Sequence, residues 1–269
     1  MNGNNIYALI LGSSSGFGKA TAIELAKKGY NIFGVHLDMG SNKKLALELV
    51  EEIKSYGVEC IFYNVNAADD SKRQEVIADI KEIFSKKENP RLRVLLHSLA
   101  FGAIRPLFDD DYNNMVNKKQ IEMTMDVMAN SLVYWVQDIF RAKLFAENSR
   151  IFALTSVGSE RAMSHYGSIS AAKAALEAYI RQMAVELAKY KINANAICAG
   201  LTDTPASQKI PGFSGMLNHA KEHNPYNRNT QPEDVAHTIS MLANEEFYWI
   251  NGQVIKVDGG ESILNFLES

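Results

Sequence analysis

The sequence predicts an α/β fold, in which a doubly wound parallel seven-stranded sheet carries helices on both faces within a single domain over residues 1–269. Strand-like and helical hydrophobic patterns alternate along the chain without a long linker or a low-complexity tract. A glycine-rich turn joins the first strand to the first helix. The chain of 269 residues, of which 46% are hydrophobic, is long enough to bury one sizeable core.

Each element is predicted from its hydrophobic period. Buried strands are expected near residues 6–12, 31–37, 58–65, 93–98, 150–156, 191–198 and 253–257, and helices near 17–28, 42–56, 70–86, 118–146, 162–189 and 232–243. Parallel sheets of this kind bind ligands at the carboxyl ends of their strands, where we expect Gly12, His36, Asn64, His97, Ser156 and Cys198.

The stretch from Thr204 to Thr230 is the exception to this alternation. It contains Pro205, Pro211 and Pro225, and Gly212 and Gly215 also interrupt any continuous helix. A long irregular insert at this edge of a sheet is usually a substrate loop or a lid, which we expect at about 204–230. A merely structural excursion is the alternative.

The first turn has the composition of a phosphate-binding loop. A buried strand over 6–11 is followed at once by Gly12-Ser13-Ser14-Ser15-Gly16-Phe17-Gly18 and then by a helix. Glycines allow a tight turn and a close approach of the backbone to a pyrophosphate, whose charge then lies at the positive end of the helix. The residues expected to contact a dinucleotide here are Gly12, Ser14, Ser15, Gly16, Phe17 and Gly18. A simple glycine-rich turn is the alternative.

A second segment spaces a serine, a tyrosine and a lysine as a redox site needs them. Tyr166 and Lys173 are seven residues apart, so on a helix they share one face, about 10 Å apart along the axis. A lysine ammonium near a phenol favours the phenolate and lowers the pKa of the tyrosine. Ser156 precedes the pair at the expected end of a strand. These three residues are the candidate catalytic group.

Charge and composition exclude several classes of partner. The net charge of −3 and the pI of about 6.1 give no electrostatic footprint for nucleic acid or an anionic membrane, so a small-molecule partner is expected. No apolar run reaches the roughly 20 residues of a membrane span, and residues 1–5 lack the basic start of a signal peptide, which predicts a cytoplasmic protein. Cys60 and Cys198 fall in predicted strands and are expected to be buried thiols, with no metal site.

Taken together, these motifs resemble the short-chain dehydrogenase/reductase family over essentially the whole chain. Gly12-x3-Gly16-x-Gly18 resembles its cofactor turn, Asn64-Val65 its adenine-contacting strand end, Gly200-x3-Thr204 its nicotinamide-contacting loop, and Val257-Asp258-Gly259-Gly260 its C-terminal strand exit. The resemblance implies a Rossmann-like fold, an NAD(P)H cofactor and a homotetramer. It also implies cofactor contacts from Asn64, Val65, Ser98, Leu99, Ala100, Lys173, Gly200, Thr202 and Thr204.

Two departures from the main branch of that family are informative. The main branch has Tyr-x3-Lys, which would put the tyrosine at Ile169, and Asn-Asn-Ala-Gly where this chain has His97-Ser98-Leu99-Ala100-Phe101. Both departures resemble the enoyl-acyl-carrier-protein reductase branch. The ordinary glycine turn, and Ser156 in place of a second tyrosine, are similar to a minority group of those reductases.

The displaced tyrosine also has a physical interpretation. Reduction of an enoyl thioester sends hydride to the β-carbon, two bonds further from the carbonyl oxygen that gathers charge. Moving a tyrosine back by one helical turn displaces its hydroxyl by roughly 5 Å, which is the right scale to follow that oxygen. Tyr166 would then stabilise the enolate and Lys173 would hold the nicotinamide ribose. Ser156 either orients the thioester carbonyl or caps the strand, and Asp126 either begins a proton path or orients local groups.

The second strand favours NADH slightly over NADPH. Asp38 supplies a carboxylate that would accept the ribose hydroxyls and repel a 2′-phosphate, and Ser15 is uncharged where many NADPH users carry a basic residue. Lys43 and Lys44 would reach a phosphate only if the loop folds back.

Three functions remain open. The first is an NAD(P)H-dependent reductase of an enoyl thioester carried by acyl carrier protein or coenzyme A, as in fatty acid synthesis. The second is a carbonyl or alcohol oxidoreductase, which Ser156 permits and the lack of a tyrosine at position 169 disfavours. The third is a nucleotide-sensing regulator without catalysis, against which Tyr166 and Lys173 argue.

Overall fold

A seven-stranded parallel sheet organises residues 5–264, which are the residues described by the computed structural model. Its strand order is β3-β2-β1-β4-β5-β6-β7, and every adjacent pair runs parallel. The predicted fold class is therefore confirmed. Within this range no helix is both long and apolar enough to cross a membrane. Residues 1–4, on which part of the signal-peptide expectation rests, lie outside it.

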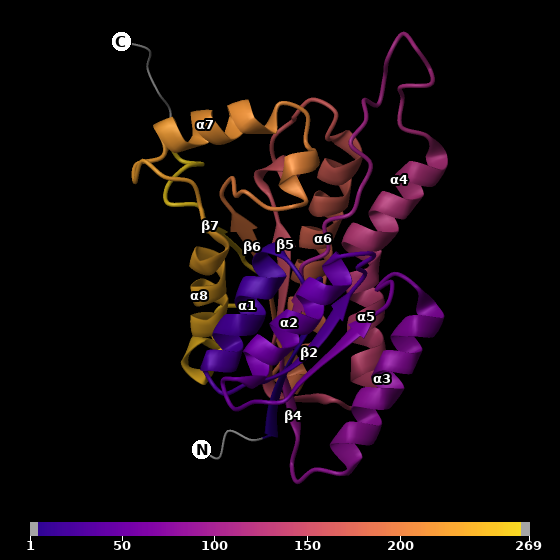
Figure 1. Cartoon of the computed structure of the whole chain (residues 1–269), viewed down its shortest axis with the longest axis vertical. Helices are drawn as coiled ribbons and strands as arrows, with labels where there is room; N and C mark the ends of the chain where they lie inside the picture. Colours follow the sequence, from indigo (N-terminus) through magenta and orange to yellow (C-terminus); the bar gives the residue numbers. More distant parts are fainter. Residues whose placement is uncertain (1–4, 265–269) are drawn as a thin grey trace.

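The main elements follow one another in strict order along the chain (Figure 1). They are β1 (Ile6–Leu11), α1 (Gly16–Lys27), β2 (Asn31–His36), α2 (Asn42–Lys54), β3 (Cys60–Asn64), α3 (Asp70–Ser85), β4 (Arg91–His97), α4 (Lys118–Met125), α5 (Ser131–Arg141), β5 (Phe145–Thr155), α6 (Gly167–Glu186), β6 (Asn193–Ala199), α7 (Phe213–His223), α8 (Pro232–Leu242) and β7 (Val254–Val257).

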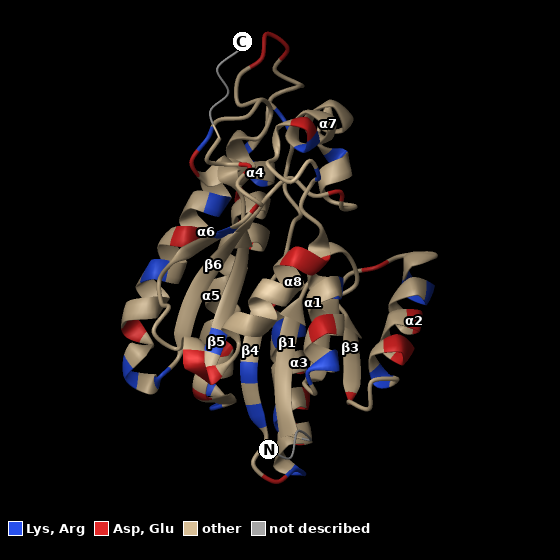
Figure 2. Cartoon of the chain, turned by 90° about the vertical axis from the view of Figure 1, so that its left-hand side faces the viewer, with Lys and Arg blue, Asp and Glu red and all other residues tan. Residues whose placement is uncertain are grey.

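The core is divided by the sheet into two layers. On one face, apolar side chains of α3, α5 and α6 pack against the sheet, with Trp135 among those fully buried. On the other face, α1, α2 and α8 contribute a second cluster that includes Leu25, Ile53 and Ile239. Lysine, arginine, aspartate and glutamate residues occur mainly on the helices and loops, and the strands are mostly uncharged (Figure 2). Burial on both faces explains why the strands have continuous apolar runs rather than alternating ones.

The strand order places a ligand crevice at the end of β1. β1 pairs with β2 on one side and with β4 on the other, so the connections leave it in opposite directions. Leu11 is in register with Val35 and with His97, and these three strands therefore end together. In open α/β sheets this switch point is where ligands bind.

The predicted helix over 118–146 is wrong at its end and interrupted in its middle. The chain forms α4, a π-helical turn (Asp126–Asn130) and then α5, which ends at Arg141. In the π-helical turn, the Ser131 hydroxyl donates to the Val127 carbonyl. Lys143 then has a φ of 57°, which ends the helix and lets β5 begin at Phe145, earlier than predicted.

The predicted helix over 162–189 begins five residues later than expected, at Gly167. His165 has a φ of 63°, in the left-handed region that a right-handed helix excludes. Tyr166 follows with a φ of −104° and a ψ of 2°, so it precedes the helix rather than belonging to it. The periodicity of 162–166 resembled a helix, but one left-handed residue separates this segment from α6.

The expectation that no continuous helix forms between Thr204 and Thr230 is also wrong. α7 occupies Phe213–His223 and lies above the carboxyl ends of the strands (Figure 1). Pro211 and Pro225 flank this helix rather than interrupt it, and Gly212, with a φ of 73°, forms its entry. Gly215 is tolerated inside α7, where Phe213 and Ala220 are buried and anchor the helix.

The two tryptophans of the chain provide a test of this packing. Trp135 is fully buried, and its indole N–H donates to the Ala67 carbonyl at 2.8 Å. Trp135→Phe removes that bond and leaves a cavity, so we expect the free energy of unfolding to fall by about 1–3 kcal/mol in urea denaturation. Trp249 is 86% exposed, and Trp249→Phe should change it by less than about 0.5 kcal/mol. Equal losses in both variants would contradict the described core.

Candidate active site

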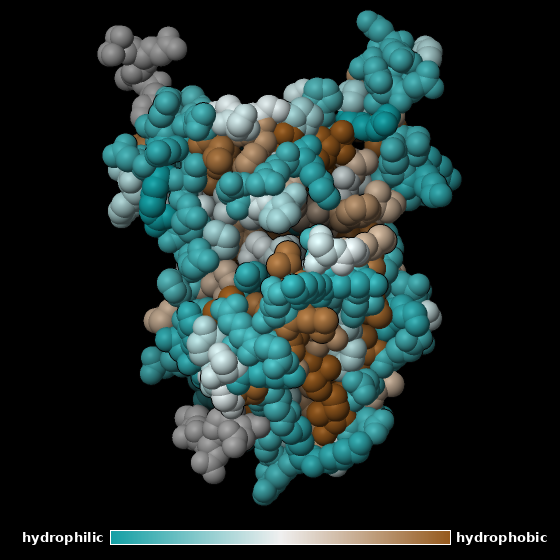
Figure 3. Space-filling model, viewed as in Figure 1, coloured by the Kyte–Doolittle hydropathy of each residue, from teal (hydrophilic) through white to brown (hydrophobic). Residues whose placement is uncertain are grey.

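A cavity of about 230 Å³ lies at the carboxyl ends of β4, β5 and β6. It brings together many of the residues singled out in the sequence, namely Phe17, Ser98, Leu99, Ala100, Ser156, Tyr166, Lys173, Gly200, Thr202 and Thr204. The rest of its lining is largely apolar and includes Ile104, Met128, Met163, Ile169, Leu201, Ile210 and Met216. Figure 3 shows apolar side chains gathered below α7 on this side of the molecule. A few polar groups within apolar walls are typical of a ligand site.

The other predicted cofactor residues do not line this cavity. They are Gly12, Ser14, Ser15, Gly16, Gly18, Asp38, Asn64 and Val65, which lie at or just beyond the ends of β1, β2 and β3. The two groups meet where a Cβ atom on Gly16 would lie 3.4 Å from the Thr204 side chain. The predicted dinucleotide residues at the ends of β1, β2 and β3 therefore lie next to the cavity residues at this point.

The glycine turn leaves no room for side chains at two of its positions. Gly12 has a φ of 86°, and a Cβ atom there would lie 2.4 Å from the Ser98 carbonyl oxygen. A Cβ atom on Gly18 would lie 1.9 Å from the Gly12 carbonyl oxygen. Ser15 precedes α1 and makes no side-chain capping bond, which leaves the N–H groups of the first helical turn available to an anion. These residues fit the pyrophosphate of a dinucleotide.

The end of β2 presents an organised carboxylate. Asp38 lies 2.8 Å from Nδ1 of His36, which is buried. The backbone N–H of Asp38 donates to the Asn64 side chain, which in turn donates to the Asp38 carbonyl. Asp38 and Asn64 are thus held side by side at the edge of the sheet where the sequence predicts contacts to adenosine. His36 is a partner that the sequence analysis placed at this edge but did not link to Asp38.

Tyr166 enters the cavity from just before α6. Its ring packs on Gly158, where a Cβ atom would lie 2.7 Å from the ring. Ser156 lies at the end of β5 and accepts a bond from the Gly158 N–H, so it caps the 3₁₀ turn that follows. Ser156 also forms a hydrogen bond with Tyr166. The capping alternative for Ser156 is therefore observed, and the other alternative, that it orients a thioester carbonyl, stays a prediction.

The environment of Tyr166 corrects the expectation that Lys173 lowers its pKa. Burial raises the pKa of Tyr166, and the hydrogen bond from Ser156 partly opposes that increase. The phenol is therefore neutral at neutral pH and can donate its proton or a hydrogen bond. Tyr166 is the N-cap residue of α6, its carbonyl accepts a hydrogen bond from the Ser170 N–H, and its side chain and that of Lys173 line the same cavity.

Lys173 is a buried ammonium held by the backbone. It is 5% exposed, and Nζ donates to the Leu154 carbonyl at 2.6 Å. Burial lowers the pKa of Lys173 to about 8, while the Glu177 carboxylate one turn further along α6 raises it. Glu177 is itself buried and accepts a hydrogen bond from Thr155. At neutral pH the ammonium is charged and has N–H groups to offer a ligand.

His97 is a buried neutral side chain at the end of β4. Its ring is fully buried, and Nε2 lies 2.9 Å from the Ser131 hydroxyl. Burial, and then the charge of Lys173, lower the pKa of His97 to about 3. The ring is therefore uncharged at neutral pH, and its lowered pKa disfavours a role as general base. Asp126 starts the π-helical turn and does not line the cavity.

The segment after β6 lines the cavity, and the chain after β7 adds a residue that the sequence analysis missed. Ala206, Ser207, Lys209, Ile210 and Met216 line the cavity from this segment. Glu261, from the chain after β7, lines it as well. The sequence signal for Glu261 was an acidic residue directly after Val257-Asp258-Gly259-Gly260. The sequence does not show that the fold returns this residue to the cavity at the carboxyl edge of the sheet.

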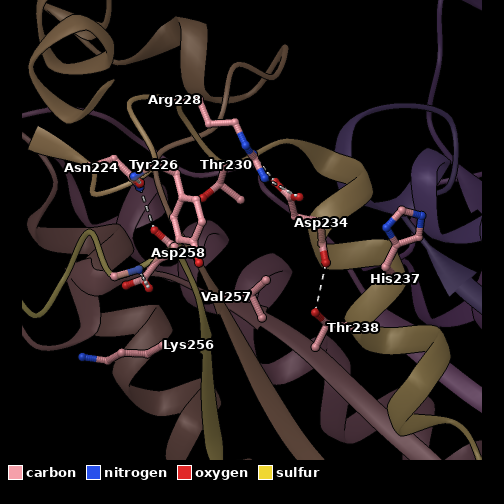
Figure 4. A pocket seen from close by; sticks show the side chains of 12 residues that line it. Asn224, Tyr226, Arg228, Thr230, Asp234, His237, Thr238, Lys256, Val257 and Asp258 are labelled. Carbon is pink, nitrogen blue, oxygen red and sulfur yellow. Dashed lines mark hydrogen bonds and ion pairs between the residues drawn. The ribbon is translucent and has the colours of Figure 1, made fainter. Parts of the chain in front are cut away.

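A second pocket, of about 460 Å³, lies beside the first turn of α8 (Figure 4). Its Arg228 and Asp234 form an ion pair at 2.6 Å, and Asn224 donates to the Asp258 carbonyl. None of the three candidate catalytic residues lines this pocket. The candidate site is therefore the cavity around Tyr166 and Lys173.

Comparison with known proteins agrees with this geometry. Residues 12–262 match the family model for enoyl-(acyl carrier protein) reductase. The chain is 30% identical over 267 residues to the enoyl-acyl-carrier-protein reductase (NADH) FabI of Nostoc sp., covering 98% of both chains. It is 29% identical over 259 residues to the 1-cyclohexenylcarbonyl-CoA reductase of Streptomyces collinus, covering 96% of this chain and 87% of that one.

Solved structures share the fold over nearly the whole chain. The crystal structure of an enoyl-acyl-carrier-protein reductase (NADH) from Aquifex aeolicus VF5 has a TM-score of 0.83 at 24% identity and covers 98% of this chain and 99% of that one. The reductase LugOII, which catalyses keto-reduction, has a TM-score of 0.82 at 25% identity and covers 97% and 99%. The chain belongs to the enoyl-acyl-carrier-protein reductase branch of the short-chain dehydrogenase/reductase superfamily.

Proposed function

We propose that the protein is an NAD(P)H-dependent reductase of the C=C bond of an enoyl thioester. The observation that carries this proposal is the position of Tyr166, which enters an apolar cavity together with Lys173 from just before α6. Ile169, where the main branch of the superfamily has its tyrosine, also lines the cavity and offers no hydroxyl. A donor displaced in this way suits an oxygen that lies further from the carbon receiving hydride.

A dinucleotide would be held along the ends of β1, β2 and β3. The glycine turn and the first turn of α1 would bind the pyrophosphate, and Asp38 with Asn64 would bind the adenosine. The loop from Gly200 to Thr204 and the Lys173 ammonium would hold the nicotinamide end. When bound, the cofactor supplies the hydride.

The protein groups would act on the developing charge. The neutral Tyr166 phenol donates to the thioester oxygen as the enolate forms, and Ser156 orients the phenol. Lys173 offers N–H groups that Leu154 does not use, which suits ribose hydroxyls. Apolar walls exclude water around the reacting bond.

The proposed cofactor is NADH. Asp38 places a carboxylate where it would repel the 2′-phosphate of NADPH. The name of the Nostoc relative gives NADH as the cofactor of that enzyme. The proposed substrate is an acyl thioester on acyl carrier protein or coenzyme A, as the names of the relatives suggest.

We also propose that the segment 204–230 closes over the acyl group. The homotetramer and the cytoplasmic location stay predictions.

Reduction of a ketone is the second candidate function. It is favoured by the hydrogen bond between Ser156 and Tyr166, because a serine next to the tyrosine suits a carbonyl oxygen in the cavity. The structural similarity to LugOII, a keto-reductase, is consistent with it. A purely regulatory nucleotide sensor is disfavoured by the assembled pair of Tyr166 and Lys173.

Replacing Tyr166 tests the proposed oxyanion donor. Tyr166→Phe should lower kcat with an enoyl thioester by about 10²–10³, because one such donor is lost, while the Kd for NADH changes little. Tyr190→Phe is the control, since Tyr190 is 43% exposed and lies outside the cavity, and it should behave as the parent. Turnover of Tyr166→Phe close to that of the parent would remove the phenol from the mechanism.

Replacing Lys173 tests the proposed ribose contact. Lys173→Ala should weaken NADH binding and turnover together, because one ammonium serves both. The pKa of about 8 adds a pH dependence, since the charged form exists below it. NADH affinity of the parent should therefore fall as the pH rises through about 8, whereas the variant should bind weakly at every pH. A parent affinity that is flat across this range contradicts the ammonium contact.

Replacing Asp38 tests the choice of cofactor. Asp38→Ala should shift the ratio of NADPH to NADH affinity towards NADPH by about tenfold, because the carboxylate neither accepts ribose hydroxyls nor repels a phosphate any longer. The control Glu48→Ala removes a charge from an exposed site on α2 and should leave the ratio unchanged. If both variants shift the ratio equally, the effect comes from overall charge and not from Asp38.

A further inference from the structure

The chain folds back after β7 and fixes Glu261 at the candidate site. The Asp258 carboxylate accepts backbone hydrogen bonds from Gly260 at 3.0 Å and from Ser262 at 3.1 Å, which closes a tight turn around Glu261. The Arg161 guanidinium donates to the Ser262 carbonyl at 2.8 Å. Glu261 is therefore held from both sides of the turn.

The same turn is tied to the segment that covers the cavity. Asn224, just after α7, donates to the Asp258 carbonyl at 2.9 Å, as Figure 4 shows. Asn224 is buried, and its side-chain oxygen accepts from the Tyr226 N–H. The backbone around Glu261 is thus braced by two separate segments of the chain.

The Glu261 side chain lies against the loop assigned to the nicotinamide. Its Oε2 accepts from the Leu201 N–H at 3.0 Å, and a Cβ atom on Gly200 would lie 2.8 Å from the same oxygen. Glu261 also lines the cavity that contains Tyr166 and Lys173. Among residues 5–264, the Leu201 N–H donates to Oε2, and no hydrogen bond to Oε1 is found.

The charges around Glu261 are few. Burial raises the pKa of Glu261, and the Leu201 N–H lowers it; Asp258 on its own segment raises it further, and Arg161 from the loop before α6 lowers it. Tyr166, Lys173 and Lys209 are the other titratable groups that line the cavity. Partial burial makes the field of such a carboxylate act with less screening than on the surface.

We propose that Glu261 is a further cofactor-site residue whose carboxylate stabilises the positive charge of an oxidised nicotinamide ring. The proposal rests on the proposed function, because it takes the loop from Gly200 to Thr204 as the nicotinamide contact. In the reaction, a bound NADH would supply a hydride to the β-carbon of the enoyl group, the C=C electron pair would move onto the thioester oxygen as an enolate, and the α-carbon would then take up a proton. The ring is oxidised and gains one positive charge, which a nearby carboxylate favours.

Glu261→Gln removes the negative charge of the side chain and keeps its shape. The amide keeps the size of the side chain and an oxygen for the Leu201 N–H, so the loop should be held as before. We expect the Kd for NAD⁺ to rise about tenfold and the Kd for NADH to change by less than about twofold, as measured by titration calorimetry on the full-length protein without acyl substrate. The Tm should be unchanged.

The control is Glu160→Gln, which makes the same chemical change at a nearby acid. Glu160 follows the turn after β5, its side chain is 57% exposed, and it faces Lys256 at 3.6 Å outside the cavity. This variant should bind both forms of the cofactor as the parent does. A shift in this control as large as in Glu261→Gln would overturn the proposal, because general charge would then explain it.

The pH dependence supplies a second readout. The carboxylate must be ionised to act, so the preference of the parent for NAD⁺ over NADH should decrease as the pH falls through the raised pKa of Glu261. The preference of Glu261→Gln should not change over the same range. If Glu261→Gln weakens the binding of NAD⁺ and of NADH equally, Glu261 only shapes the loop. If it weakens neither, the carboxylate does not reach the nicotinamide ring. Either result overturns the proposal.

These outcomes are distinct from failure of the proposed function. If the parent binds neither form of the cofactor, the dinucleotide site itself is refuted, and the proposal for Glu261 is refuted with it. If the parent binds both forms but reduces no enoyl thioester, only the substrate assignment fails. The predicted effect of Glu261→Gln on NAD⁺ can be measured in that case as well.

Discussion

The buried ammonium of Lys173 is the constraint on which the candidate site depends. Removing a charged group from water costs several kcal/mol unless partners replace its hydration. Here the Leu154 carbonyl and the nearby Glu177 carboxylate provide those partners. The carbonyl belongs to β5 and the lysine to α6, so the position of the charge is set by how this helix packs on this strand. Burial of Ala172 and Leu176 on either side of Lys173 fixes that packing.

Two polar side chains near this site, His97 and Tyr166, add no charge to that of Lys173. His97 is neutral because it is buried and because Lys173 lies near it. Tyr166 is neutral because burial raises its pKa, and the hydrogen bond with Ser156 only partly opposes that increase. A neutral phenol that shares the cavity with a charged lysine can donate to an oxyanion without first losing its proton. A charged lysine together with a neutral tyrosine and a neutral histidine suits a reaction in which negative charge develops on a substrate oxygen.

The sequence predicted the parts of this fold and site that depend on local patterns. Strand positions followed from apolar runs, and the close contacts of Gly12 and Gly18 followed from the spacing of the glycines. Features that depend on single backbone angles or on tertiary contacts could not be predicted. The left-handed His165 removes Tyr166 from α6, and α7 forms between prolines that seemed to forbid a helix. Glu261 reaches the cavity only because the chain turns back after β7.

The central claim is that this cavity directs hydride to a C=C bond conjugated with a thioester. The most direct measurement follows NADH oxidation by absorbance with crotonyl-CoA and, in parallel, with a panel of ketones of similar size. The account predicts oxidation with crotonyl-CoA, formation of butyryl-CoA in equal amount, and a kcat/KM for every ketone at least about a hundredfold lower. Faster oxidation with a ketone, and none with crotonyl-CoA, would contradict it and identify carbonyl reduction as the activity of the site.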